Sequence, residues 1–438
     1  MTERVRPSAG DVSTANGADA VKAIADALWT AYDDDPAAQI GAAATMRRAS
    51  LEAGRAGAAV FFAYLAASRD DGSEARWERE RAETLLGAAI AVTDPTESSG
   101  LLHHGAVGVA WAATHLGDRF GIGRGGDGVG ERFADAVDAA LLERVSVSLW
   151  TGDYDLIVGL VGFGLYALER LPRPRAVQCV EQIVARLDEL AERCPDGVTW
   201  WTSPELTRRP DELPRGFYSL GLSHGVPGAI GLLAQAVAAD IAVERARPLL
   251  DGAVTWLLAQ QLPAGAGSRF PAWIEPDVAP TAHRQTWCYG DLGIGCALLV
   301  AGRSLGDEAL TEEARAIAVA AATAPFKPKS IEDATFCHGA MGNAHLLRRL
   351  FMELGDQALQ DAADASLRRG LAMRRPGGRL GAFSVAAFDP ERRMRRIAYR
   401  GLLMGSAGIG LALLAATSRV EPAWDRLFLV SPAVVLAV

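Results

Sequence analysis

The sequence predicts an all-α protein: a seven-fold α/α toroid in which a double layer of helices surrounds one centre. Three observations support this prediction. A four-residue Gly-x-x-Gly frame recurs along the chain, each instance leads into an apolar stretch of helical length, and amphipathic segments separate successive instances. Strand signals are scarce, as are units in which a strand, a glycine-rich loop and a helix follow one another. We therefore expect inner apolar helices, outer amphipathic helices, and glycine-rich turns gathered at one end.

The glycine frames are numbered first to seventh in chain order and comprise residues 54–57, 105–108, 159–162, 225–228, 290–293, 339–342 and 405–408. The residues that follow are mostly apolar, such as VAWAATHL after the second frame and IGLALLAA after the seventh. Paired glycines at a helix start permit close approach of the backbone. One Gly-x-x-Gly means little in a chain with 46 glycines, but seven in the same context indicate a repeat.

The segments between the frames predict the outer layer and the rim. Residues 133–143, 175–193 and 307–324 are amphipathic and rich in Ala, Glu and Arg, which is typical of surface helices. Two long connections, 195–218 and 263–286, are rich in proline and aromatic residues, and we expect them to form rim loops. We expect a single domain over residues 1–438, with residues 1–17 flexible.

Composition excludes several classes of protein. Half of the chain is apolar, which allows a large core, and the net charge of −9 argues against a nucleic-acid-binding surface. Residues 1–17 lack the apolar run of a signal peptide, and no stretch reaches the roughly 18 apolar residues of a membrane span. The five cysteines are an odd count in a large chain without an export signal, so we expect reduced thiols.

Three frames carry reactive residues directly before the first glycine: Ser223-His224 in the fourth, Trp287-Cys288-Tyr289 in the fifth and Cys337-His338 in the sixth. Equivalent turns of a ring would point these side chains at one central space. Two cysteines and a histidine are ligands that zinc binds tetrahedrally, and catalytic zinc sites keep one position open. A single free cysteine is more often a small buried residue. The three together predict a zinc site held by Cys288, Cys337 and His338.

More polar residues lie around the same turns. Asp155 precedes the third frame, and Arg284 and Tyr289 flank Cys288. With His224 they would supply an acid, a base and a cation, which proton transfer beside a developing anion requires. An alternative for Asp155 is a helix cap, and the sequence favours neither.

The other histidines and cysteines have weaker contexts. His104 also stands directly before a frame, but no cysteine accompanies it, so we interpret it as a structural or rim histidine. His283 and His345 lie outside the frame position and rank below His338 as ligands. We assign the remaining cysteines to packing or to the surface; they are Cys179, Cys194 and Cys296.

The motifs Ser-His-Gly, Trp-Cys-Tyr-Gly and Cys-His-Gly, in this order and at this spacing, resemble the lanthipeptide cyclases of the LanC-like family. The resemblance covers about residues 51–415 and is to the standalone, class I type. It implies a seven-fold α/α toroid around one zinc ion, with Cys288, Cys337 and His338 as the ligands. It also implies that His224 and Asp155 handle protons, with His224 the first choice for the acid and the reverse assignment open.

Within this resemblance, Arg284 and Tyr289 would line the site. Two positions depart from the family's usual pattern: Leu292, where proline is common, and Met341, where alanine is common. Neither is a ligand, so we expect them to affect loop shape and substrate preference more than the chemistry.

The activity that the resemblance implies is a zinc-dependent, intramolecular Michael-type addition. Cysteine thiolates of a dehydrated precursor peptide add to dehydroalanine or dehydrobutyrine and form the (methyl)lanthionine thioether rings of lantibiotics. The implied partners are that peptide, with leader and core, a dehydratase and an exporter. The implied location is the cytoplasm, including a peripheral place at a membrane-associated biosynthetic complex, without membrane insertion and without a nucleic-acid partner.

Two alternative functions stay open. A related zinc transferase would add a small thiol such as glutathione to dehydroamino acids, and a non-catalytic scaffold would only present the peptide. The dense basic run at residues 392–396 is either a solvated loop or a docking point for an acidic leader peptide.

Overall fold

The computed structural model describes residues 12–33, 42–70, 72–96, 102–124, 128–206, 213–325, 331–375, 377–378, 380–388 and 393–431. Contacts divide the chain into two compact units, each built from two separate stretches. Unit 1 comprises Met1–Ala134 and Phe326–Trp424, and unit 2 comprises Asp135–Pro325 and Asp425–Val438. Among the described residues, no helix is long and apolar enough to cross a membrane.

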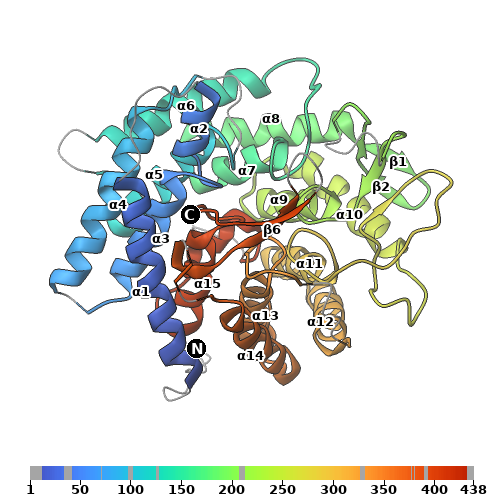
Figure 1. Ribbon diagram of the computed structural model, residues 1–438. Coiled ribbons are helices and arrows are strands. Elements are labelled where there is room, and N and C mark those ends of the chain that lie inside the picture. Colours follow the sequence, from blue (N-terminus) through green and yellow to red (C-terminus); the bar gives the residue numbers. More distant parts are fainter. Residues whose placement is uncertain are drawn as a thin grey trace. The chain divides into compact units, whose positions relative to one another are not determined.

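Helices dominate both units (Figure 1). The elements of unit 1 are α1 (Val12–Asp33), α2 (Ala42–Ala49), α3 (Arg55–Ala67), α4 (Ser73–Ala91), α5 (Ala106–Phe120), α13 (Ala340–Leu354), α14 (Gln357–Ala372), η2 (Leu380–Ala382), β6 (Val385–Phe388), β7 (Met394–Ile397) and α15 (Ser406–Thr417). Those of unit 2 are α7 (Leu160–Glu169), α8 (Pro174–Leu190), β1 (Glu192–Cys194), β2 (Gly197–Thr199), β3 (Trp201–Thr202), β4 (Phe217–Ser219), α9 (Val226–Ala238), α10 (Val243–Ala259), β5 (Trp273–Ile274), α11 (Asp291–Leu305) and α12 (Glu308–Thr323). Two elements contain a unit boundary: α6 (Val129–Val145) and η3 (Ala423–Phe428).

Every glycine frame begins an inner helix, as the sequence predicts. The first glycine of each frame is the N-cap of α3, α5, α7, α9, α11, α13 or α15. Most of these helices are apolar along most of their length and deeply buried: every residue of α9 from Val226 to Ala236 is buried. The last turns of α13 are more polar, and Met352 and Glu353 are exposed. The amphipathic segments 133–143 and 307–324 coincide with α6 and with α12 and its caps. The segment 175–193 was predicted too long, because α8 ends at Leu190 and Glu192 and Arg193 belong to strand β1.

Consecutive inner and outer helices pack as hairpins within each unit, for example α3 with α4, α11 with α12, and α13 with α14. The last inner helix, α15, takes its outer partner from the other end of the chain, because α1 packs against it. Of residues 1–17, which we expected to be flexible, 1–11 lie outside the described residues and 12–17 belong to α1.

The glycines are required by close backbone contacts. A Cβ atom on Gly342 or Gly408, the second glycines of the sixth and seventh frames, would lie 1.8 Å from the carbonyl oxygen six residues earlier. The turn before each inner helix therefore folds back onto the helix start, and any side chain at these positions would displace it.

Backbone hydrogen bonds join the frame turns within each unit. In unit 1, Cys337 N–H donates to the Leu403 carbonyl at 3.0 Å, and Glu52 N–H donates to the His103 carbonyl at 3.0 Å. In unit 2, Leu156 N–H donates to the Ser223 carbonyl at 3.2 Å. The side chains that stand directly before the glycines are therefore presented side by side within each unit.

The expected rim loops contain short strands. Strand β1, which ends directly before the connection 195–218, forms a hairpin with β2. Strands β3, β4 and β5 form an antiparallel sheet with Trp201 opposite Tyr218 and Ser219 opposite Trp273. Aromatic residues and threonine favour such pairing. Residues 207–212 of the first connection lie outside the described part of the chain.

The basic run is not a loop over its described part. Met394–Ile397 form strand β7, in which Arg395 pairs with Ala387 and Arg396 with Ala386 of β6. Both arginines are exposed, and Arg392 lies outside the described residues. Antiparallel pairing with β6 satisfies backbone groups that a solvated loop would leave to water.

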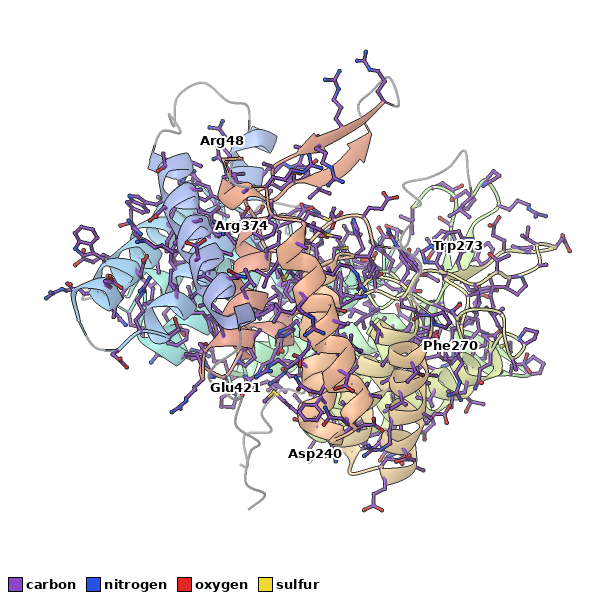
Figure 2. All side chains as sticks on the ribbon, turned by 60° about the horizontal axis from the view of Figure 1, so that its bottom comes forward. Arg48, Asp240, Phe270, Trp273, Arg374 and Glu421 are labelled. Atoms are coloured by element: carbon purple, nitrogen blue, oxygen red, sulfur yellow. The ribbon has the colours of Figure 1, made fainter. Side chains whose placement is uncertain are left out.

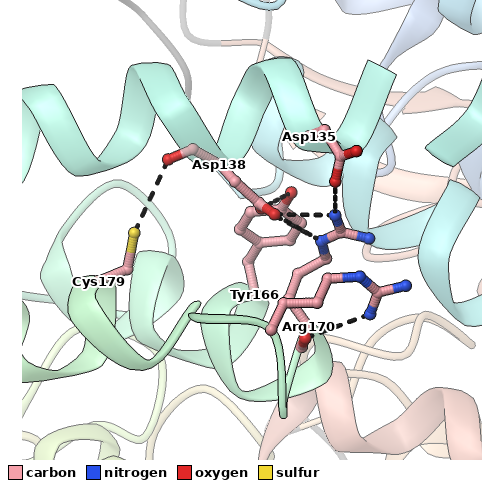
Figure 3. A network of polar contacts seen from close by, with 6 residues as sticks. Asp135, Asp138, Tyr166, Arg170 and Cys179 are labelled. Atoms are coloured by element: carbon pink, nitrogen blue, oxygen red, sulfur yellow. Dashed lines mark hydrogen bonds and ion pairs between the residues drawn. The ribbon is translucent and has the colours of Figure 1, made fainter. Parts of the chain in front are cut away.

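A buried ionic network ties α6 to the end of α7 in unit 2 (Figure 3). The Arg170 side chain is fully buried, its Nε donates to Asp138 Oδ2 at 2.9 Å, and one of its terminal nitrogens donates to Asp135 at 2.6 Å. Tyr166 donates its hydroxyl proton to Asp138 at 2.6 Å. Buried charges are tolerated when they are paired in this way. Burial, together with the nearby Asp138, raises the pKa of Cys179 to about 12, which disfavours its thiolate form.

Candidate functional site

Cys337 and His338 occupy the turn that precedes α13 in unit 1. The turn is closed by Gly339 N–H, which donates to the Thr335 carbonyl at 3.1 Å, and by Ala340 N–H, which donates to the Asp333 carbonyl at 3.0 Å. Cys337 is buried, and the His338 side chain is 20% exposed. The sequence predicts both as metal ligands, and this turn holds a thiol and an imidazole next to each other.

A buried carboxylate that the sequence analysis missed stands behind the imidazole. Asp333 Oδ2 lies 3.5 Å from His338 Nε2, and its Oδ1 accepts the Thr335 N–H at 2.9 Å and the Thr335 hydroxyl at 2.7 Å. Burial raises the pKa of Asp333, but hydrogen bonding to His338 and Thr335 and the charge of His338 outweigh it and hold this pKa below its usual range. The sequence signal that could have identified this carboxylate is the spacing of Asp333 and Thr335 shortly before Cys337-His338.

Cys288 lies in the corresponding turn before α11 in unit 2. It is 5% exposed, its sulfur is 3.6 Å from Thr286 Oγ1, and its carbonyl accepts the Ser223 hydroxyl at 3.3 Å. A Cβ atom on Gly221 would lie 2.5 Å from this carbonyl and 2.6 Å from the Tyr289 ring. Glycine at 221 therefore lets the turns of the fourth and fifth frames pack together.

His224 and Asp155 form a hydrogen-bonded pair in unit 2. His224 Nδ1 is 2.5 Å from Asp155 Oδ2, the Asp155 side chain is 7% exposed, and the His224 side chain is 33% exposed. The other carboxylate oxygen accepts the Val158 N–H at 2.7 Å. Asp155 thus stabilises the turn before α7 and also contacts the imidazole. It is not the cap of α7, whose N-cap is Gly159, and its part in proton transfer stays a prediction.

The His224 ring belongs to a group of neighbouring rings that also contains Tyr289, Trp273 and His283. The ring centroids of His224 and Tyr289 are 6.4 Å apart, and Tyr289 lies 6.0 Å from Trp273 and 5.7 Å from His283. Figure 2 labels Phe270 and Trp273 on the connection between α10 and α11. All four of the rings from His224 to His283 are partly exposed, so they can contact a bound molecule.

A buried carboxylate anchors this aromatic connection. Asp291, the first residue of α11, accepts the Arg269 N–H at 2.7 Å and the Phe270 N–H at 3.0 Å. Burial raises the pKa of Asp291 more than these hydrogen bonds lower it. This anchor could not be predicted from the sequence, because Asp291 is 22 positions from Arg269 and 21 from Phe270.

Arg284 precedes Cys288 by four residues and is partly exposed. Its Nε atom is buried and has no hydrogen-bond partner among the described residues. A guanidinium group donates hydrogen bonds and cannot be deprotonated in proteins. Arg284 therefore places a permanent positive charge beside the turn that contains Cys288, in unit 2, which also contains His224.

Two other histidines that the sequence analysis ranked below the ligands, His104 and His345, lie in other settings. His104 Nδ1 is 2.7 Å from Glu52 Oε2 in unit 1. His345 is buried and packs against Trp424, with ring centroids 4.6 Å apart and the rings tilted by 31°. The two family departures are also packing residues: Leu292 and Met341 are buried within α11 and α13.

The chain is similar to known proteins over most of its length. The model of the lanthionine synthetase C-like protein family matches residues 45–429. Among solved structures, nisin cyclase is similar, with a TM-score of 0.72, 18% sequence identity, and coverage of 94% of this chain and 97% of that chain. No curated protein matches the sequence. The fold is that of an α/α toroid, which confirms the architecture predicted from the glycine frames. The chain belongs to the lanthionine synthetase C-like family.

Proposed function

We propose that this protein is a zinc-dependent cyclase that forms (methyl)lanthionine thioether rings in a dehydrated precursor peptide. The observation that carries the proposal is the His224–Asp155 pair, which stands in the same kind of turn as the cysteines and the imidazole of the candidate metal site. Membership of the lanthionine synthetase C-like family and the likeness to nisin cyclase support a thioether-forming activity.

Cys288, Cys337 and His338 would hold the metal. They are a set of donors that could bind one metal ion, and two thiolates with one imidazole suit zinc. The buried Asp333 carboxylate beside His338 Nε2 is the outer partner that metal-bound histidines usually have. When bound, zinc lowers the pKa of a coordinating thiol, whose usual value is about 8.5, and so supplies a nucleophilic sulfur at neutral pH.

The residues of the chain would handle the proton and the developing charge. Addition of a thiolate to Cβ of the dehydro residue forms a C–S bond and leaves negative charge on the neighbouring carbonyl, and Cα must then gain a proton. Asp155 holds Nδ1 of His224, which directs the other ring nitrogen outward as the proton donor. Arg284 would stabilise the enolate oxygen. The thiol proton lost is balanced by the proton gained at Cα, so the mass of the peptide does not change.

The exposed aromatic rings suit a peptide substrate. Trp273, His283 and Tyr289 would contact the peptide beside His224 and keep water from the enolate. A dehydratase must supply the dehydrated residues, and we place the reaction in the cytoplasm, before an exporter removes the product.

The test uses one precursor peptide in dehydrated and unmodified forms. Wild-type protein with zinc should make the cysteines of the dehydrated peptide resistant to a thiol-alkylating reagent without a change in peptide mass. The unmodified peptide should keep its mass and its free thiols. The matched control is Cys337→Ala at slightly acidic pH, where the uncatalysed addition is slow because free thiolate is scarce.

Three results would contradict the proposal. If the dehydrated peptide stays fully alkylatable, the protein is a scaffold. If the peptide gains the mass of an added small thiol instead of closing, the protein is a transferase. Loss of water from the unmodified peptide would make it a dehydratase.

A further inference from the structure

We infer that Asp333 is a positioning residue that holds the His338 imidazole in the orientation in which it binds the metal. The inference rests on the proposed zinc site and names a residue outside its set of ligands. Its basis is the arrangement of Asp333, Thr335, His338 and Gly339 in one turn of unit 1.

The carboxylate is buried and fixed. Asp333 is 3% exposed, and both Thr335 donors, the N–H at 2.9 Å and the hydroxyl at 2.7 Å, bind its Oδ1. The carboxylate therefore cannot rotate without losing two hydrogen bonds. Its second oxygen, Oδ2, is the one that faces His338 Nε2 at 3.5 Å.

The glycine frame makes room for this carboxylate. A Cβ atom at position 339 would lie 2.5 Å from Asp333 Oδ1 and 2.2 Å from the Thr335 nitrogen. Any side chain at 339 would push the carboxylate away from the imidazole. The first glycine of the sixth frame thus caps α13 and also permits the contact between Asp333 and His338.

The contact selects the state of the ring that can bind a metal. A carboxylate accepts a hydrogen bond from Nε2–H, which keeps the proton on that nitrogen and would direct the lone pair of Nδ1 toward the metal. Such outer carboxylates fix the tautomer and the ring orientation of metal-bound histidines, and their removal typically costs about 10-fold to 100-fold in metal affinity or activity.

The decisive variant is Asp333→Asn. The asparagine oxygen can still accept from Thr335, so the turn is kept, but the amide then turns an N–H₂ donor toward the Nε2–H of His338. We expect zinc to leave the purified protein about 10-fold to 100-fold faster than from wild type, measured with excess chromogenic chelator. The denaturation midpoint of the metal-free protein should not change.

The matched control is Asp153→Asn. Asp153 precedes the first glycine of the third frame by six residues, as Asp333 precedes that of the sixth, but its turn carries no proposed ligand. Zinc release should match wild type. Thr335→Val, which keeps the carboxylate and removes one of its two fixing donors, should accelerate release by less than Asp333→Asn does.

The outcomes separate this inference from the proposed function. Wild-type protein that binds no zinc would overturn the proposed function and this inference with it. Zinc-loaded wild type with unchanged release from Asp333→Asn would overturn the inference alone. If Asp333→Asn does not fold, unchanged release from Thr335→Val would also overturn it.

Discussion

Replacing Asp155 by asparagine tests the division of labour within the His224–Asp155 pair. The asparagine oxygen can still accept the Val158 N–H, which Asp155 accepts at 2.7 Å, so the turn before α7 should keep its shape. The carboxylate oxygen that contacts His224 Nδ1 at 2.5 Å becomes an amide nitrogen. Because this nitrogen donates, the imidazole must accept at Nδ1 and loses the anion that stabilises its protonated form.

The expected loss follows from the hydrogen bond that is removed. A hydrogen bond to a charged group contributes about 1.5–3 kcal/mol, which corresponds to a rate loss of about 10-fold to 150-fold. His224→Asn removes the proton donor itself and should slow cyclisation by about 10²-fold to 10⁴-fold. If Asp155 acts only through the ring, the double variant should be no slower than His224→Asn alone.

The assay is the rate at which thiols of a saturating dehydrated peptide become resistant to alkylation, with zinc content shown to be equal in all four proteins. An Asp155→Asn variant slower than His224→Asn would mean that Asp155 is itself the acid. Losses that multiply in the double variant would refute the idea that the two residues act as one unit.

Two further predictions concern stability. Arg170→Met leaves the buried Asp138 without its cation and should lower the free energy of unfolding by about 3–5 kcal/mol in chemical denaturation. The exposed control Arg175→Met should change this free energy little, and a loss below about 1 kcal/mol for Arg170→Met would contradict a stabilising role of the network. Burial raises the pKa of Glu52, but hydrogen bonding to His104 and nearby positive charge outweigh it and lower this pKa from 4.5, so the carboxylate contributes stability above that pH and loses it as the pH falls through the lowered value. The difference in unfolding free energy between wild type and Glu52→Gln should therefore shrink below about pH 4.5, and a difference that grows there would contradict the assignment.

The fold could be predicted from the sequence because its repeat is local. Each glycine frame and its apolar follower lie within about a dozen residues, so the start of each inner helix is visible without tertiary information. The partner of α15 could not be predicted in this way, since α1 reaches it from the other end of the chain. The strands of the rim were missed because two or three residues are too few to show an alternating pattern.

The residues of the candidate site could likewise be predicted from the sequence only in part. Cys288, Cys337, His338 and His224 stand next to glycines in equivalent turns, and this position marks them in the sequence. Asp333 was missed because its contact with His338 depends on a turn that folds back against α13. Asp291 was missed, and His104 was interpreted as structural, because their partners lie in other segments of the chain. Asp291 accepts the Arg269 N–H, and His104 contacts Glu52. Sequence spacing shows residue types in equivalent positions, but not the contacts that the turns create.

The most direct test of the central claim is X-ray absorption at the zinc edge on the purified protein. We expect one zinc per chain, with two sulfur neighbours at about 2.3 Å and one imidazole nitrogen at about 2.0–2.1 Å. Cys288→Ala and Cys337→Ala should each lose zinc or one sulfur neighbour, and His338→Ala should lose zinc or the imidazole. A full complement of zinc with an unchanged set of neighbours in all three variants, or a wild-type spectrum without sulfur, would contradict the claim that these residues hold the metal.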